Sequence, residues 1–182
     1  MNKWIYETEG NNTVRYVLGI VGKKPLICIG INPSTAEPDS LDRTINKVEN
    51  IAFNNGYDSW MMFNIYPKRD TIFDNLHYMC NDNIHIKNIR IIKKYINEIE
   101  NPTIWVAFGD HIYHRKYLIP CFYDICNAIK DKNITWVTTG LNKSGTPKHP
   151  LYQKNNSVLQ VFNMEKFIKS LEAKMKSSQK AL

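Results

Sequence analysis

The residues best suited to chemistry in this sequence are two asparagines and a histidine, each near a change from apolar to polar sequence. Asn32 and Asn64 end the runs LICIGIN and WMMFN, and His149 stands in TPKHPLY, downstream of the run TWVTT. An asparagine amide carries a donor and an acceptor on one rigid group, and a neutral imidazole can donate to an oxygen that gains negative charge. Such a set could orient a water molecule, read the polar edge of a ligand and stabilise an anion.

Two carboxylates lie close to Asn32 in the stretch EPDSLDRT. Asp39 or Asp42 could activate a water molecule or offset positive charge that develops on a substrate. Asp42 also stands directly before a helical pattern, where an aspartate commonly caps the first turn by accepting backbone hydrogen bonds. The sequence leaves both interpretations of Asp42 open.

The cysteines occur without the regular spacing of a disulfide or metal-binding framework, at Cys28, Cys80, Cys121 and Cys126. His111 and His114 could in principle join Cys80 or Cys121 in binding zinc, but no pair has a typical ligand spacing. The sequence therefore predicts reduced thiols, no metal site and no cofactor.

Apolar, β-rich runs without strict alternation predict the strands that would position these residues, at 26–31, 60–65, 103–108 and 135–139. Helical patterns lie between them, at 42–54, 83–100 and 112–130. Continuous apolar runs suit parallel strands covered on both faces. The predicted fold class is therefore α/β, a three-layer α/β/α domain with a central, mainly parallel four-stranded sheet. The turn signal EGNN predicts an additional N-terminal β-hairpin over residues 3–22.

The carboxyl ends of parallel strands share one edge of a sheet, and ligands bind at that edge in this architecture. Asn32, Asn64, Gly109 and His149 are therefore expected at one rim. Pro33 fixes its own φ and biases the residue before it away from the helical region. Asn32 is accordingly predicted to be extended, with its amide directed into a pocket rather than capping a helix.

Length and composition are those of one well-packed domain, with 182 residues, 43% apolar content and no run near the roughly 20 apolar residues of a membrane span. We expect a domain over residues 1–168 and a basic, solvated tail over 169–182. The net charge of +7 favours a polyanionic partner. The N-terminal sequence lacks the pattern of a signal peptide, so we expect a cytoplasmic monomer that does not engage a membrane.

Three longer motifs, GINPSTAEPDSLDRT, NGYDSWMMFNIYPKRDT and GLNKSGTPKHPLY, are similar to the family DUF1643 over residues 26–152. More remotely, GINPST, MFNIYP and KHPLY resemble three motifs of the uracil-DNA glycosylase superfamily, the first as it stands in the mismatch-specific branch. The sequence departs from that superfamily in having Leu151 where the better-known members have a serine after His-Pro. It also lacks the Asp-Pro-Tyr of the uracil-specific branch and the cysteine spacing of the iron-sulfur branches.

The resemblance implies a uracil-DNA glycosylase-like fold and roles for individual residues. Asn32 would hold the attacking water, His149 would stabilise the leaving base, and Asp42 or Asp39 would offset charge on the sugar. Asn64 would read a base flipped out of the DNA, in a base-binding group with Ile31, Pro33 and Tyr66. The residues expected to contact DNA are Ser34, Thr35, Lys68, Arg69, Lys143, Lys148, Leu151 and Tyr152.

These roles together predict a DNA glycosylase that acts on a damaged, mismatched or hypermodified base, including bases of phage DNA. Two alternatives remain open. The first is a module that binds a nucleotide or modified base in the same pocket without cleaving it. The second is hydrolysis or transfer on a free nucleoside or nucleotide, because a fold alone does not fix a function.

Overall fold

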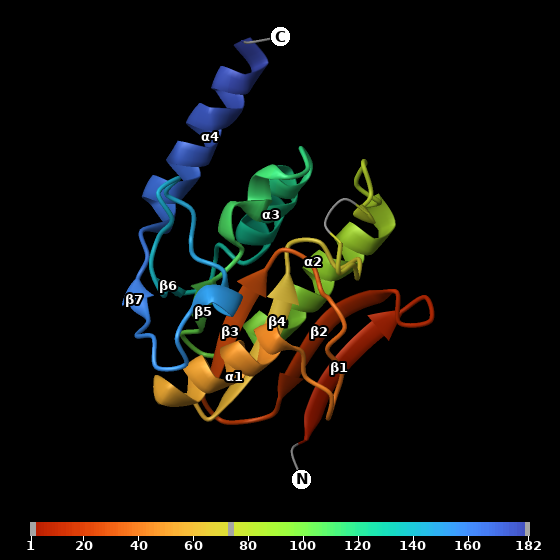
Figure 1. Cartoon of the computed structure of the whole chain (residues 1–182), viewed down its shortest axis with the longest axis vertical. Helices are drawn as coiled ribbons and strands as arrows, with labels where there is room; N and C mark the ends of the chain where they lie inside the picture. The colour runs from red at the N-terminus through yellow and green to blue at the C-terminus, as the bar shows by residue number, and fades with distance from the viewer. Residues whose placement is uncertain (1–2, 73–74, 181–182) are drawn as a thin grey trace.

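One mixed β-sheet organises the protein (Figure 1). The computed structural model describes residues 3–72 and 75–180, and side chains as far as residue 175. Seven strands follow the order β1-β2-β4-β3-β5-β6-β7 across the sheet. Their bounds are β1 Trp4–Glu9, β2 Val14–Ile20, β3 Pro25–Gly30, β4 Ser59–Asn64, β5 Thr103–Val106, β6 Thr135–Thr138 and β7 Gln160–Val161.

The centre of the sheet is parallel, as the apolar runs predicted. β3 pairs with β4 and with β5, and β5 pairs with β6, all in parallel. In the β3–β4 register Gly30 lies opposite Asn64, so the two strands end side by side. Every residue of β3 and β4 is buried, which explains why neither strand shows an alternation of apolar and polar residues.

The prediction of a four-stranded sheet with a separate hairpin is wrong in its extent. The hairpin of β1 and β2 is present, but β2 also pairs antiparallel with β4 and so extends the sheet. β2 is buried along its whole length, and its pairing covers the edge that β4 would otherwise expose. The two-residue strand β7 adds an antiparallel edge to β6 and is too short to leave a periodic pattern in the sequence.

Helices cover both faces of the sheet. On one face α1, Arg43–Asn54, packs through Ile45, Val48 and Ile51 on side chains such as Trp60. On the other face lie α2, Asp82–Asn97, α3, Leu118–Ala128, and α4, Met164–Lys180. The sheet therefore has helical layers on both sides, and none of the helices described is long and apolar enough to cross a membrane.

Two segments differ from their predicted bounds. The helix predicted over 112–130 divides into a 3-10 turn, η2, Gly109–Tyr113, and α3, which begins at Leu118. Pro120 lies in the first turn of α3, where its missing N–H costs nothing, whereas a helix from residue 112 would place it in the interior. Helix α4 continues through residue 169, where the predicted tail begins, and Leu171 is fully buried.

Candidate functional site

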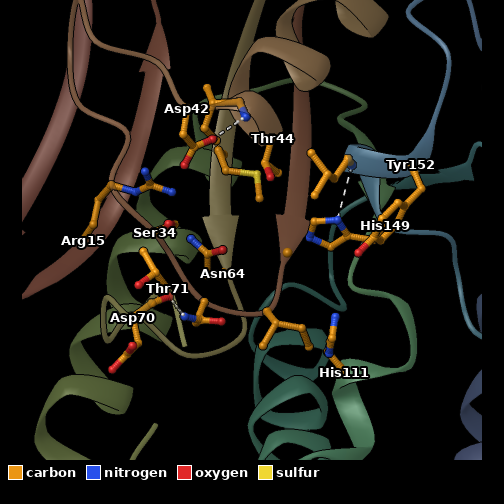
Figure 2. A pocket seen from close by; sticks show the side chains of 16 residues that line it. Arg15, Ser34, Asp42, Thr44, Asn64, Asp70, Thr71, His111, His149 and Tyr152 are labelled. Atoms are coloured by element: carbon orange, nitrogen blue, oxygen red, sulfur yellow. Dashed lines mark hydrogen bonds between the residues drawn. The ribbon is translucent and has the colours of Figure 1, made fainter. Parts of the chain in front are cut away.

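A cavity of about 250 Å³ lies at the carboxyl ends of β3 and β4. Asn32, Asn64 and His149 all line it, so the strand ends bring the three expected residues together (Figure 2). In the close-up, Asn64 lies near the centre, between Arg15 and His149. The cavity is thus walled by groups from the sheet, from the segment after β3 and from the segment after β6.

Asn64 presents an unpaired amide to this cavity. The residue is 1% exposed, and neither Nδ2 nor Oδ1 has a hydrogen-bond partner among the described residues. Its backbone carbonyl, by contrast, accepts from Asn88 Nδ2 at 2.9 Å, which fixes the end of β4. A buried donor or acceptor without a partner costs about 1–3 kcal/mol. An amide kept in this state is arranged for a partner that is not part of the chain.

Gly30 leaves the space in front of Asn64 open. A Cβ at this position would lie 2.5 Å from Met62 Cε and 3.1 Å from Asn64 Oδ1. Any side chain at Gly30 would therefore displace Met62 and crowd the unpaired amide. The absence of a side chain at the end of β3 is what makes the amide of β4 accessible from the cavity.

Asn32 has a different environment. Its Nδ2 donates to the carbonyl of Asp70 at 2.9 Å and to that of Pro33 at 3.2 Å. The N–H of Asp70 in turn donates to the carbonyl of Pro33 at 3.0 Å, so Asn32 joins the turn after β3 to the segment after β4. The amide nitrogen is committed to these bonds. The group that Asn32 can offer to a ligand is Oδ1, which is an acceptor.

His149 is a neutral imidazole. Its Nδ1 accepts from the backbone N–H of Leu151 at 3.3 Å, at the start of the 3-10 turn η3, Pro150–Tyr152. Burial and, to a smaller extent, the neighbouring His111 lower the pKa of His149 to about 4, although Asp42 opposes both effects. Because Nδ1 accepts a hydrogen bond, the neutral ring carries its proton on Nε2. His149 can therefore donate to a ligand without being charged.

Arg15 is a site residue that the sequence reasoning missed. It is 1% exposed, lines the cavity and donates from Nη1 to the carbonyl of Ala36 at 3.1 Å, while its Nε has no partner. Burial and the neighbouring Arg69 lower the pKa of Arg15 to about 10, against the opposite effect of Asp42, so it stays charged at neutral pH. An arginine inside the apolar run VRYVLGI was the available signal, because a charged side chain on a buried strand needs a reason.

Of the two candidate aspartates, Asp42 lies at the cavity and Asp39 does not. Asp42 lines the cavity and also caps α1, since its Oδ1 accepts from the N–H of Ile45 at 2.9 Å. The capping interpretation of Asp42 is therefore confirmed, and its carboxylate still belongs to the cavity. Asp39 does not line the cavity. It is exposed, has a φ of 60° and accepts from Trp4 Nε1 at 3.1 Å.

The expected base-binding residues are only partly brought together. Ile31 lines the cavity beside Asn64, but Pro33 and Tyr66 do not. Tyr66 is fully buried, and its hydroxyl pairs with His77 Nδ1 at 2.8 Å and accepts from the N–H of Asn81. Tyr66 lies two residues after Asn64, beyond the end of β4, and packs in the core cluster that contains the buried residues of α2 and α3, away from the cavity.

The expected DNA contacts divide into three groups. Ser34, Leu151 and Tyr152 line the cavity, and the side chain of Tyr152 is 78% exposed at its mouth. Thr35 and Arg69 line a more open hollow of about 480 Å³ next to it. Lys68, Lys143 and Lys148 line neither hollow.

Arg69 has a structural role within the chain. Its guanidinium donates to the carbonyls of Ser34 and Ala36 and, at 2.7 Å, to the hydroxyl of Tyr6. These bonds hold the segment after β3 against the hairpin. Both terminal nitrogens of the guanidinium are engaged in this way, and its buried Nε has no partner among the described residues.

Other residues at the cavity were not expected from the sequence. Gly109, by contrast, is predicted at the rim. It lies next to His149, since a Cβ added to Gly109 would be 3.4 Å from His149 Cβ. The ring of His111 lies 6.2 Å from that of His149, nearly perpendicular to it. The cavity residues outside the expected set are Arg15, Gly30, Thr44, Ile45, Met62, Asp70, Thr71 and His111.

A group of possible metal ligands lies elsewhere in the chain. One ligand atom each from Cys80, His85 and Cys121 lies within 4.8 Å of the others. The histidine of this group is His85, not His111 or His114. No spacing in the sequence associates His85 with the cysteines, since the three residues come from two helices and the segment before one of them.

The chain matches the model of one known family. Residues 15–151 match DUF1643, described as "Protein of unknown function (DUF1643)". This match spans most of the chain, so the protein belongs to the DUF1643 family. No curated protein and no solved structure matches it.

Proposed function

Starting from membership of the DUF1643 family, we propose that this protein is a DNA glycosylase that extrudes a modified or mismatched base and hydrolyses its N-glycosidic bond. The observation that carries the proposal is the unpaired, buried amide of Asn64 beside a neutral His149 in one cavity. The motifs GINPST, FNIYP and KHP, all at strand ends or in the segment that follows them, support a fold of the uracil-DNA glycosylase type.

Asn64 would recognise the base. Its amide can donate and accept at the same time, which matches the alternating polar edge of a pyrimidine. The cavity of about 250 Å³ is slightly smaller than the roughly 300 Å³ of the smaller drug-binding pockets, which suits one planar base. A base bound there would satisfy Nδ2 and Oδ1 together and so relieve the cost of burying them.

His149 would stabilise the departing base. When the bond to the sugar breaks, negative charge collects on the base, in particular on the O2 of a pyrimidine. The Nε2–H of a neutral His149 can donate to this oxygen, and a donor in such a position commonly contributes about 3–4 kcal/mol to lowering the barrier. The depressed pKa of His149 keeps the ring neutral and ready to donate across the neutral pH range.

Asn32 and Asp42 would act at the sugar. With its nitrogen held by the carbonyls of Pro33 and Asp70, Asn32 offers Oδ1 to orient a water molecule. An oxocarbenium-like centre needs only a weak nucleophile that is well placed. Asp42 supplies the carboxylate at this cavity and would offset the positive charge on the sugar, so Asp39 drops out of the proposed mechanism.

The surface near the cavity fits an approach by DNA. Tyr152 and Leu151 stand at the mouth, where an exposed aromatic side chain could enter the space left by the extruded base. The net charge of +7 would attract the phosphate backbone. Arg69 is excluded from the proposed contacts because its guanidinium is committed within the chain.

Arg15 favours a second candidate function, the binding of a free nucleotide without cleavage. A buried guanidinium with an unpaired Nε at the cavity is suited to an anionic group such as a phosphate. If the protein is a glycosylase, Arg15 instead stabilises the charged or polar edge of the bound base. The two functions therefore differ in what Arg15 contacts and in whether a bond is broken.

The deciding experiment uses the full chain with a panel of duplex and single-stranded DNAs that carry uracil, mismatched, damaged and phage-type modified bases. Released base is measured by mass spectrometry, and abasic sites are measured by alkaline cleavage. Base release that is lost in His149→Ala and kept in the exposed control Asn97→Ala supports the glycosylase. Nucleotide binding that requires Arg15, with no base released from any substrate, supports the second function instead.

A further inference from the structure

The two cysteines Cys80 and Cys121 form a cluster with a histidine between α2 and α3. Cys80 directly precedes Asn81, the N-cap of α2, and His85 lies in the first turns of that helix. Cys121 lies on α3. His85 is 6% exposed and Cys121 is 2% exposed, so the cluster is largely shielded from solvent. None of its members lines the cavity at the strand ends.

The separation of the two sulfurs fits a shared metal ion. Cys80 Sγ and Cys121 Sγ are 3.7 Å apart, and neither thiol is in a disulfide. Two thiolates on a tetrahedral zinc ion, each at about 2.3 Å, are separated by about 3.8 Å. The chain therefore holds the sulfurs at the spacing of two corners of a zinc tetrahedron.

His85 has one nitrogen available for a metal, and a carboxylate holds the other. Its Nε2 lies 3.0 Å from Asp124 Oδ2. Its Nδ1 is buried without a hydrogen-bond partner among the described residues, although a ring nitrogen in this state is costly. Histidines that bind zinc commonly donate their second N–H to a carboxylate, which fixes the ring and its tautomer. The carboxylate of Asp124 and the Nε2 of His85 have this arrangement.

From these distances we infer that the protein binds a zinc ion through the thiolates of Cys80 and Cys121 and the Nδ1 of His85. Water takes the fourth position, and Asp124 is a positioning residue that orients His85. Cysteine and histidine together are the ligands that zinc prefers in proteins. The proposed site departs from the sequence-based expectation that the chain has no metal site.

The metal would join two parts of the fold. The segment of residues 65–80 leads from β4 to α2 and contributes Asp70 and Thr71 to the cavity. Zinc bound to Cys80 fixes the far end of this segment to α3 through Cys121. The ion therefore stabilises the α2–α3 contact, whichever reaction the cavity performs.

The test begins with the full chain, reduced and stripped of metal with a chelator, then titrated with Co²⁺ and with Zn²⁺. We expect one ion per chain, and Co²⁺ should give the visible absorption of a tetrahedral site with thiolate ligands. Cys80→Ser, Cys121→Ser and His85→Gln should each lower the affinity by 100-fold or more. Cys126→Ser, a matched change of a cysteine on α3 outside the cluster, should leave binding unchanged.

Asp124→Asn separates positioning from direct coordination. It should weaken the binding of Co²⁺ by about 10- to 100-fold and leave the thiolate absorption bands in place, because no ligand is removed. A fall in affinity as large as that of the three ligand variants, together with shifted Co²⁺ ligand-field bands, would show that Asp124 coordinates the ion and would overturn its proposed role.

A further measurement uses no variants and so does not depend on whether the variants fold. In the wild-type chain, Zn²⁺ should slow the alkylation of Cys80 and Cys121 and leave that of Cys126 unchanged, as read by peptide mass mapping. The inference is wrong if Co²⁺ gives no thiolate bands, if the three cysteines respond equally, or if the freshly purified chain contains a Cys80–Cys121 disulfide instead of a metal.

Discussion

The ends of β3 and β4 are neighbours in the sheet, and each carries an asparagine at the same cavity, yet the two asparagines have opposite environments. Asn32 is partly exposed, and its amide nitrogen is bonded to two carbonyls of the surrounding turns. Asn64 is buried, and both polar atoms of its amide lack partners among the residues that the structure describes. Asn32 therefore contributes to the structure of the site, whereas the unpaired amide of Asn64 costs stability in the ligand-free chain.

The same contrast extends to the charged and ionisable groups of the cavity. His149 and Arg15 are desolvated, and burial lowers the pKa of each. Asp42 is stabilised by its bond to the first turn of α1. The site thus consists of groups that the fold satisfies, which build its walls, and groups that the fold leaves unsatisfied, which face the ligand.

The largest expected effect comes from His149 and Asn32. If the protein is a glycosylase, His149→Ala and Asn32→Ala should each lower the rate of base release by about 100-fold or more, because both act mainly in the transition state. DNA binding should change little. Single-turnover excision on the substrate found in the panel measures the effect, with Asn97→Ala as the control. If both variants cleave at the wild-type rate, the proposed mechanism is wrong.

The pH dependence of stability tests the desolvation of His149. Between about pH 6.5 and pH 4 the unfolded chain binds a proton at this residue and the folded chain does not. Stability therefore falls as the pH decreases through this window, by about 3 kcal/mol in total for this group. Urea unfolding at several pH values measures the slope. In His149→Gln the fall in the free energy of unfolding across this pH window should be smaller by this amount. An unchanged fall would show that His149 is not desolvated.

Gly30→Ala tests the accessibility of Asn64. The new methyl group would displace Met62 and crowd Asn64 Oδ1, so ligand affinity should fall by about 10-fold or more. The double variant Gly30→Ala with Met62→Ala removes the contact with Met62 and keeps the crowding of Asn64. Equilibrium binding of a substrate duplex or nucleotide distinguishes the two causes. Recovery of full affinity in the double variant would assign the effect to Met62 alone.

The smallest expected effects are changes in the free energy of unfolding. Their different signs at Asn32 and Asn64 test the comparison of the two asparagines most directly. Asn32→Ala should destabilise the chain by about 1 kcal/mol, because the carbonyls of Asp70 and Pro33 lose their donor. Asn64→Leu should leave stability unchanged or raise it by a similar amount, because it removes an unpaired buried amide. Urea unfolding of the ligand-free chain provides both values.

A destabilisation by Asn64→Leu as large as that by Asn32→Ala would show that the amide of Asn64 is satisfied in the free protein. The contrast between the two strand ends would then be lost. In that event Asn64→Ala should also have no effect on discrimination among bases, which we otherwise expect it to weaken.

Several features of the fold could be predicted because their cause is local. The runs LICIG and WMMFN are apolar at every position, which identifies buried parallel strands without reference to the rest of the chain. The capping role of Asp42 follows from its place before the pattern of α1. Pro120 could have indicated the late start of α3, since proline is tolerated in a helix only near its beginning.

Other features have causes that lie far away in the chain. The short strand β7 exists because β6 offers it an edge, and Asp39 leaves the cavity because its backbone turns with a positive φ toward Trp4. The association of Cys80 and His85 with Cys121 requires α2 and α3 to pack together. No spacing in the sequence encodes any of these three outcomes.

The sequence by itself determined that polar residues of three separate segments meet at one edge of a sheet, because apolar runs that alternate with helical patterns indicate parallel strands, whose carboxyl ends share one edge. Only the tertiary structure decided which of those polar groups are satisfied. One partner of Asn32, the carbonyl of Asp70, comes from a segment 38 residues away, and the amide of Asn64 has no partner among the described residues. Hydrogen bonding and desolvation depend on the atoms that packing brings near a group, so a sequence can place an amide at a site without showing whether it is free to bind.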